Sequence, residues 1–312
     1  MSKRRIYIWK NGTELIALIL RLRKIHAFAL LLVLLCVLFA FALRADPTRQ
    51  TLWAPQTRQL PIVMYHHVLP DLSRAGRYVL PVRQLEEDLL YLQSCGYSSV
   101  NVGDLAAFVN GKRDLPEKIV MLTFDDGYQS AEDYVLPLLE QTDMKAVLAV
   151  VGQFAQTYTD SGDTNVRYAC LSWDALRRLH ESGRFELQSH TYNLHSNRTN
   201  GRRGLAQKSG ESEEAYRAMQ TADLMKNQEA SQSHTGATPT ALVYPYGAFS
   251  PATTRTAKDC GFLATLTCEE QINTVTPGDP DCLYGLGRFN RPAGKESAAF
   301  FKKLGIVPAE KT

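Results

Sequence analysis

The stretch MLTFDDGYQS, residues 121–130, places two adjacent carboxylates at the end of an apolar run that is typical of a buried strand. Asp125 and Asp126 are followed at once by Gly127, which permits a sharp turn. Because neighbouring carboxylates repel each other, a positive charge is expected between or beside them. The stretch therefore predicts a strand that ends in a charged site, whose positive partner must come from elsewhere in the chain.

Similar apolar runs recur along the chain and alternate with amphipathic helical patterns. The expected strands are 62–68, 97–102, 118–124, 145–151, 184–190, 240–246, 262–267 and 284–290. The expected helices include 82–96, 131–141, 172–183 and 251–261. This alternation is typical of an α/β fold, and the number of units favours a (β/α) barrel of about seven strands over an open sheet. Polar residues at the carboxyl ends of the strands would then meet at one mouth.

Two histidines follow the expected strand 184–190. His190 and His195 are five residues apart, so they would be about 140° apart on a helix and on opposite faces of a strand, and they converge only in a loop. Two imidazoles and one carboxylate with open positions form a catalytic set for a divalent metal ion. We therefore expect a cation to supply the missing positive charge. The polar segment 196–213 that follows predicts a surface loop or lid.

Two further motifs carry polar groups at strand ends. His66 and His67 occupy successive strand positions, so their side chains should point to opposite faces. A buried structural histidine is one interpretation of either, and a proton donor to a leaving group is the other. In YPYGAFS, residues 244–250, Gly247 permits a sharp turn at which a free backbone N–H could stabilise an oxyanion. Read alone, this motif is an ordinary strand-to-helix turn.

The first 44 residues differ from the rest of the chain. Residues 27–43 are uncharged and apolar, and they follow a basic segment, which indicates a membrane helix with a cytoplasmic N-terminus. A cleaved signal peptide is the alternative, because AFA at 40–42 has the small-x-small form of a cleavage site. The predicted organisation is a basic cytoplasmic leader (1–24), a transmembrane signal-anchor (25–44), a linker (45–60) and an exported catalytic domain (61–312).

The charges of this leader account for the overall net charge of +3. Eight of the 35 Lys and Arg residues but only one of the 32 acidic residues lie in the first 44, so the remainder is acidic, at −4. No basic stripe with interleaved aromatic residues follows, and the composition therefore argues against nucleic-acid binding. Five of the six cysteines lie outside the apolar segment without a C-x-x-C spacing, which is typical of buried free thiols, although one or two disulfides are an alternative.

Together these motifs resemble the polysaccharide deacetylases, the NodB-homology carbohydrate esterases, over about residues 60–295. The resemblance implies a distorted (β/α) barrel and a metal-dependent hydrolase that removes acetyl groups from sugar polymers. For TFDDG it implies that Asp125 is the general base and that Asp126 binds the metal. The spacing of HTYNLH is similar to that of the branch acting on exported poly-N-acetylglucosamine, and it implies His190 and His195 as metal ligands.

The chain departs from the family pattern beside its YPYG motif. Val243 stands where the family commonly has an arginine that orients the catalytic Asp. We expect Arg288, in GLGRFNR, to pair with Asp125 instead; the alternative is that Arg288 only caps the sheet. The motif still implies that Tyr246 offers its backbone N–H to the oxyanion.

A second departure concerns the general acid. The family's late Leu-x-His is missing, since no histidine follows His234. The segment MYHHV resembles the corresponding strand of the circularly permuted branch. That resemblance implies His66 as the acid, with His67 in reserve.

The resemblance also implies a cofactor and a substrate, and the N-terminal segment implies a location. The cofactor is a divalent ion, and the ligand set of two imidazoles and one carboxylate favours Zn²⁺. The substrate is an acetylated polysaccharide, either peptidoglycan or an exported polymer, and the domain is expected on the outer side of the cell membrane, tethered by its N-terminal helix. No obligate protein partner is expected. The alternative is a surface-anchored glycan-binding module that has lost activity, because the motif arginine and the late histidine are missing.

Overall fold

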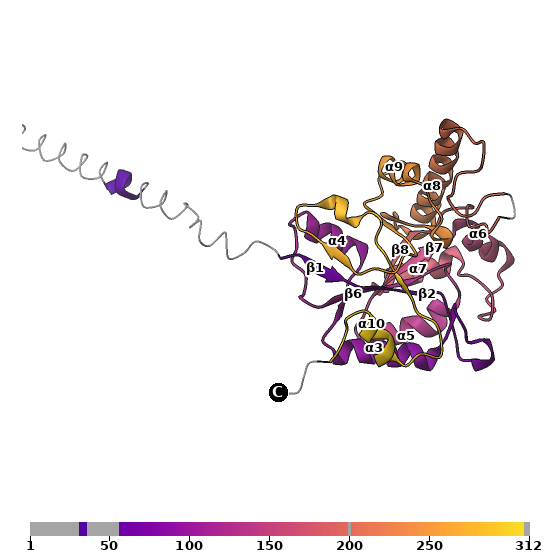
Figure 1. The fold of residues 1–312 in the computed structure, drawn as a ribbon, viewed down its shortest axis with the longest axis horizontal. Helices are drawn as coiled ribbons and strands as arrows, with labels where there is room; N and C mark the ends of the chain where they lie inside the picture. The colour runs from indigo at the N-terminus through magenta and orange to yellow at the C-terminus, as the bar shows by residue number, and fades with distance from the viewer. Residues whose placement is uncertain (1–30, 36–55, 199–200, 309–312) are drawn as a thin grey trace, which may run out of the picture. The chain divides into compact units, whose positions relative to one another are not determined.

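The computed structural model describes residues 31–35, 56–198 and 201–308 of the chain (Figure 1). The chain divides into two units, Met1–Ala54 and Pro55–Thr312. Only residues 31–35 of the first unit are described, and they are helical. The predicted leader and most of the predicted signal-anchor, 25–44, therefore lie outside the described residues. Within the described ranges, no helix combines the length and the hydropathy that crossing a bilayer requires.

The second unit is built on a parallel sheet. Its strands lie in the order β10-β9-β8-β7-β6-β2-β12, and every neighbouring pair is parallel. They are β2 (Ile62–Tyr65), β6 (Ile119–Phe124), β7 (Ala146–Val150), β8 (Phe185–Ser189), β9 (Ala241–Val243), β10 (Ala264–Leu266) and β12 (Phe289–Asn290). The short strand β5 (Ser98–Ser99) also pairs with β6. The α/β class and the seven-stranded parallel core agree with the sequence.

The sheet curls until one segment bridges its two edges. The N–H of Thr267 donates to Leu286 O at 2.8 Å, and the N–H of Arg288 donates to Glu269 O at 2.8 Å, so this segment lies along the end of β10. The residues that directly follow Arg288 form β12 and pair with β2. The result is a distorted half-barrel whose opening is spanned by residues 286–290, rather than a regular closed barrel.

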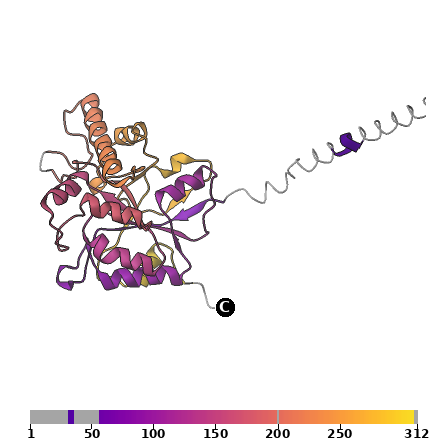
Figure 2. The same cartoon turned by 180° about the vertical axis from the view of Figure 1, so that it is seen from behind.

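The strands alternate between two apolar cores, as period-two side chains require. In β6, Val120, Leu122 and Phe124 belong to one core, and Ile119 and Met121 belong to the other. The first core is covered by α3 (Val82–Ser94), α5 (Leu136–Gln141), α7 (Trp173–Glu181) and α10 (Ser297–Lys303). Figures 1 and 2 show α3, α5 and α10 together on one side of the sheet. The second core is closed by α4 (Val102–Val109) and by β1 (Arg58–Leu60) paired with β11 (Asn273–Val275).

Several expected boundaries shift for identifiable reasons. The expected strand 62–68 divides at His66, because the next residues form β3 (His67–Leu69) and change partner to β4 (Val79–Pro81). The expected strand 240–246 ends at Val243, because Pro245 has no N–H to donate and Tyr246 has a positive φ of 59°. The expected linker 45–60 contains β1 at its end.

The other helices lie before and after the predicted loop along the chain. The expected helix 251–261 is α9 (Pro251–Asp259), and α6 (Gly152–Ser161) follows β7. Of the predicted loop at 196–213, the described residues 196–198 and 201–212 form no helix, and they lead into α8 (Glu213–Thr235), a long helix that the sequence pattern did not indicate. Its buried positions are largely polar, among them Gln220, Asn227 and Gln228, and this hides its apolar periodicity.

The bridging segment contains a glycine that has no room for a side chain. A Cβ on Gly287 would lie 2.5 Å from the backbone oxygen of Glu269 and would also overlap Gln271. Gly287→Ala should therefore lower the free energy of unfolding by about 1–3 kcal/mol. Gly76→Ala is the matched control, since a Cβ there meets nothing within 4 Å. Urea unfolding followed by tryptophan fluorescence measures both, and equal stabilities would mean that the bridge is not tightly packed.

Candidate metal centre and active site

The two carboxylates of the opening motif diverge because the backbone reverses between them. β6 ends at Phe124, and Asp126 and Gly127 both have a φ of 72°. Left-handed backbone is uncommon outside glycine but is tolerated best by Asp and Asn. Asp125 is buried at 3% exposure, whereas the side chain of Asp126 is partly accessible. The turn thus sends adjacent carboxylates to different partners.

Asp125 forms a bidentate ion pair with Arg288, which is fully buried. Nη1 donates to Oδ1 at 2.7 Å and Nη2 donates to Oδ2 at 2.9 Å. Arg288 is held in turn by Thr267 O at 2.8 Å and by the hydroxyl of Thr123 at 3.1 Å. Burial is the largest single effect and raises the pKa of Asp125, but the Arg288 guanidinium together with the neighbouring histidines holds this pKa well below its usual range. Asp125 is therefore a carboxylate at neutral pH.

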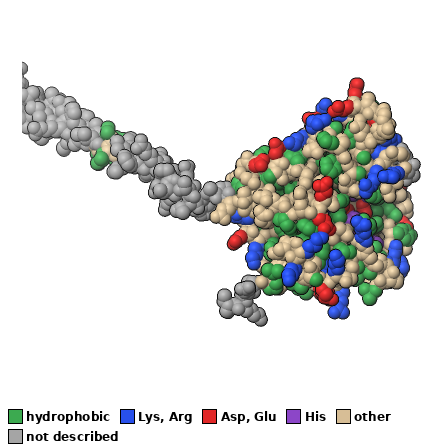
Figure 3. Space-filling view, in the orientation of Figure 1, with side chains coloured by type: hydrophobic (Ala, Val, Ile, Leu, Met, Phe, Trp, Pro, Cys, Tyr) green, Lys and Arg blue, Asp and Glu red, His purple; other side chains and the backbone are tan. Residues whose placement is uncertain are grey.

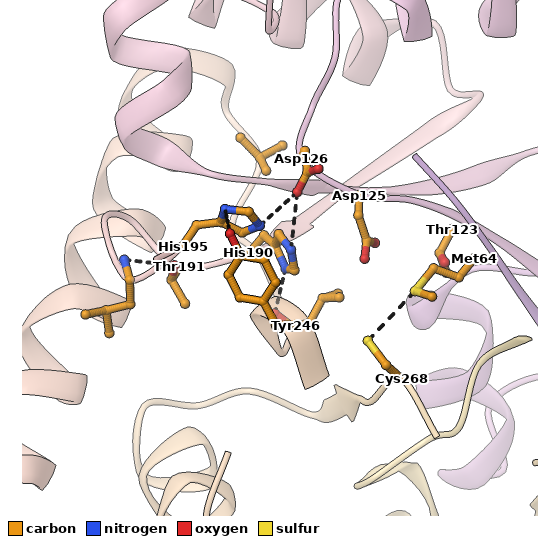
Figure 4. A network of polar contacts seen from close by, with 12 residues as sticks. Met64, Thr123, Asp125, Asp126, His190, Thr191, His195, Tyr246 and Cys268 are labelled. Atoms are coloured by element: carbon orange, nitrogen blue, oxygen red, sulfur yellow. Dashed lines mark hydrogen bonds and ion pairs between the residues drawn. The ribbon is translucent and has the colours of Figure 1, made fainter. Parts of the chain in front are cut away.

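The other carboxylate faces both histidines (Figure 4). Asp126 Oδ1 lies 3.6 Å from His190 Nε2 and 3.1 Å from His195 Nε2. One candidate ligand atom from each of the three residues lies within 4.8 Å of the other two. His190 directly follows β8 and His195 lies in the next loop, so the pair converges in a loop as predicted from its spacing.

The surroundings of the histidines fit a divalent cation. His190 Nδ1 donates to Val243 O at 2.8 Å, which leaves Nε2 free as the ligand atom. Burial lowers the pKa of His190 to about 4, so the ring is neutral, as a metal ligand must be. His195 Nδ1 contacts the hydroxyl of Tyr246 at 3.2 Å, which likewise turns Nε2 toward Asp126. Two imidazoles and one carboxylate are a common set of protein ligands in catalytic metal sites.

The two neighbouring histidines of MYHHV lie on opposite sides of the backbone, as expected. His66 lines the same pocket as the carboxylates, and its ring lies 4.8 Å from that of Tyr78. Its Nδ1 is buried without a hydrogen-bond partner among the described residues. His67 is buried elsewhere, where Nδ1 lies 3.0 Å from the hydroxyl of Ser130 and Nε2 lies 3.3 Å from Arg167 O. His66 therefore has access to the pocket, and His67 has a packing role.

A single pocket of about 670 Å³ collects most of the predicted residues. It is lined by His66, Asp125, Asp126, His190, His195 and Tyr246, and Arg288 lies behind Asp125. Its size is that of a small-molecule site. The sequence reasoning missed other lining residues, which are Met64, Arg77, Tyr78, Tyr128, Asn197, Arg203, Cys268, Glu270 and Asn290. Some stand beside motifs that were noticed: Tyr128 follows the Asp-Asp-Gly turn, and Asn290 is two residues after Arg288.

Comparison with known proteins agrees with this geometry. Residues 112–265 match the family model described as polysaccharide deacetylase. The chain contains a polysaccharide deacetylase domain. The chain is 29% identical over 255 residues to the poly-beta-1,6-N-acetyl-D-glucosamine N-deacetylase of Escherichia coli (strain K12). This match covers 76% of this chain and 37% of that protein. The chain thus spans well under half of the length of this relative.

Solved structures show the same architecture. A de-N-acetylase from Aggregatibacter actinomycetemcomitans superimposes with a TM-score of 0.67 at 25% identity, covering 80% of this chain and 100% of that one. IcaB from Ammonifex degensii superimposes with a TM-score of 0.62 at 23% identity, covering 75% of this chain and 93% of that one. The second likeness supports the fold alone, and the distorted half-barrel is therefore a fold that this chain shares with both proteins.

The ion pair behind the pocket can be tested by a double-mutant cycle. Arg288→Gln leaves a buried carboxylate without a counter-charge and should cost about 3–5 kcal/mol of stability. Combining it with Asp125→Asn removes both charges, so the double variant should lose less than the sum of the single losses. The measurement is the free energy of unfolding in urea at neutral pH.

Arg184→Gln is the control for this cycle, because its partner Asp143 is 89% exposed, and it should change stability little. Strict additivity of Arg288→Gln and Asp125→Asn would contradict the coupling between the two side chains.

Proposed function

We propose that this chain is a metal-dependent hydrolase that removes acetyl groups from N-acetylated sugar polymers. The observation that carries the proposal is the shared pocket, in which a three-residue ligand group stands next to a separate, arginine-held carboxylate. A metal site alone would serve many reactions. An ionised base beside that site is what the hydrolysis of an unactivated amide requires.

Three residues are proposed to hold the cation: Asp126, His190 and His195. Two imidazoles with one carboxylate favour Zn²⁺ and leave a coordination position open for water or substrate. When bound, the ion polarises the acetyl carbonyl and makes a coordinated water more acidic.

The remaining steps are assigned to the chain's own groups. Asp125 accepts a proton from the attacking water, whose oxygen forms a bond to the acetyl carbon. The backbone N–H of Tyr246 is proposed to donate to the oxyanion that develops. His66 donates a proton to the sugar nitrogen as the C–N bond breaks, which gives acetate and a free amino sugar. Arg288 touches no substrate; it keeps Asp125 ionised and in place.

The name of a relative supports the proposed substrate class. The E. coli relative is named for poly-β-1,6-N-acetyl-D-glucosamine, and we propose that this chain also acts on a polymer of N-acetylglucosamine. Peptidoglycan, which carries the same acetamido sugar, is the second candidate polymer.

A surface polymer also suits the predicted location. We propose that residues 25–44 anchor the chain and that the domain at 61–312 works on the outer side of the membrane. A reporter enzyme that is active only after export, fused after the last residue, should be active in cells and should be recovered with membranes. Recovery in the cytosol would contradict this location.

Isosteric substitutions at the two neighbouring positions distinguish the roles of the two carboxylates. Asp125→Asn should retain the cation but lower kcat for acetate release by at least about 100-fold, because it removes the base. Asp126→Asn should lose both the cation and the activity. The assay is acetate release from β-1,6-linked N-acetylglucosamine oligomers in the presence of Zn²⁺, with metal content measured on the same preparations.

The alternative, a glycan-binding module without catalysis, makes a different prediction. It would bind the oligomer equally well with or without a chelator, and it would release no acetate. Full activity of Asp125→Asn would refute the assignment of Asp125 as the base. It would not contradict the description of the fold.

A further inference from the structure

The charges around the pocket are unevenly balanced. Three acidic residues line it: Asp125 is neutralised by Arg288, Glu270 forms an ion pair with Lys303, and Asp126 faces the histidines. Two arginines also line it, Arg77 and Arg203. Neither has a carboxylate partner within the ranges that the structure describes, so the pocket wall carries surplus positive charge.

This lack of partners is unusual for arginines in this structure. Of the 16 arginines at described positions, 12 form ion pairs with a carboxylate. Two of the four that do not, Arg77 and Arg203, line the same pocket. Figure 3 shows blue side chains bordering the place where purple histidine atoms reach the surface. The surplus charge is thus placed where a substrate would enter.

Both arginines are held in place by the pocket. The guanidinium of Arg203 lies 5.8 Å from the ring centroid of Tyr246, and its Nη2 donates to Tyr246 O at 3.3 Å. The guanidinium of Arg77 lies 5.2 Å from the ring centroid of Tyr78, and Arg77 O accepts a hydrogen bond from Asn290 at 3.1 Å. Cations over aromatic rings keep their N–H groups available for another acceptor. The guanidinium groups of Arg77 and Arg203 can therefore donate hydrogen bonds to a ligand, and their positive charges remain to be balanced by it.

A guanidinium is suited to a planar carboxylate, to which it can donate two parallel hydrogen bonds. We infer that Arg77 and Arg203 select a glycan in which the N-acetylated sugar stands next to a carboxylate-bearing sugar. This inference rests on the proposed removal of acetyl groups, and it favours a glycan with carboxylate-bearing sugars, as peptidoglycan is, over the homopolymer of N-acetylglucosamine. The same charges disfavour a neighbouring sugar that has already lost its acetyl group, because its amine is then a cation.

The test uses matched oligosaccharides that share one central N-acetylglucosamine and differ only in the charge of the flanking sugars. These are a uronic acid, a sugar with a carboxylate on a lactyl ether, neutral glucose, and glucosamine. We expect kcat/KM for acetate release to be about tenfold higher with acidic than with neutral neighbours, and lowest with glucosamine. The two acidic substrates distinguish the two sources of the carboxylate, and a preference for either supports the inference.

The arginines are tested by their effect on this preference. Arg77→Gln and Arg203→Gln together should reduce the ratio of acidic to neutral kcat/KM to about one, and raised salt should reduce the wild-type ratio in the same direction. Arg74→Gln is the matched control: Arg74 lies on the same β3–β4 connection as Arg77 and has no carboxylate partner among the described residues, but it does not line the pocket. It should keep the wild-type ratio.

The outcomes separate this inference from the proposed function. Acetate release from none of the four substrates would overturn the proposed function itself. Equal kcat/KM for acidic, neutral and cationic substrates would overturn only the inference. A uniform loss on all four substrates in the double variant would also overturn it, because the arginines would then support the pocket rather than read charge.

Discussion

The buried ion pair between Asp125 and Arg288 is the constraint on which the site depends. A carboxylate inside the half-barrel would be protonated if it stood alone, and a protonated acid cannot accept a proton from water. The guanidinium that prevents this is carried by residues 286–290, the same segment that bridges the two edges of the sheet. One stretch of chain therefore both closes the fold and keeps Asp125 ionised.

The adjacent carboxylates are separated because each has its own partners. The left-handed backbone at Asp126 directs its side chain toward the loop that carries the histidines, while Asp125 remains on the inner side of the strand end. Asp125 is balanced by a fixed guanidinium, whereas Asp126 faces the neutral ring of His190 and the ring of His195 in the candidate metal centre. The Asp-Asp-Gly turn thus creates two different chemical environments within two residues.

The parts of this site that the sequence predicted are those encoded by local patterns. The strand before the Asp pair, the loop containing His190 and His195, and the sheet class all follow from hydrophobic periodicity and spacing. The pairing of Arg288 with Asp125, across more than 160 residues, was expected only because a family arginine is replaced by Val243. The contact of Tyr246 with His195 depends on a positive φ at Tyr246, which no local sequence pattern predicts. Helix α8 was not predicted because its buried face is largely polar.

The two histidines are supported in different ways, and this difference links the pocket wall to the candidate metal centre. His190 is buried and oriented by a backbone carbonyl, which can hardly move without disturbing β9. His195 is oriented by a phenol hydroxyl, and the residue that supplies it is contacted by Arg203. Binding of an acidic group to Arg203 would therefore act on Tyr246 and, through its hydroxyl, on the orientation of His195. Charge recognition at the wall and ligand geometry at the centre share one connecting side chain.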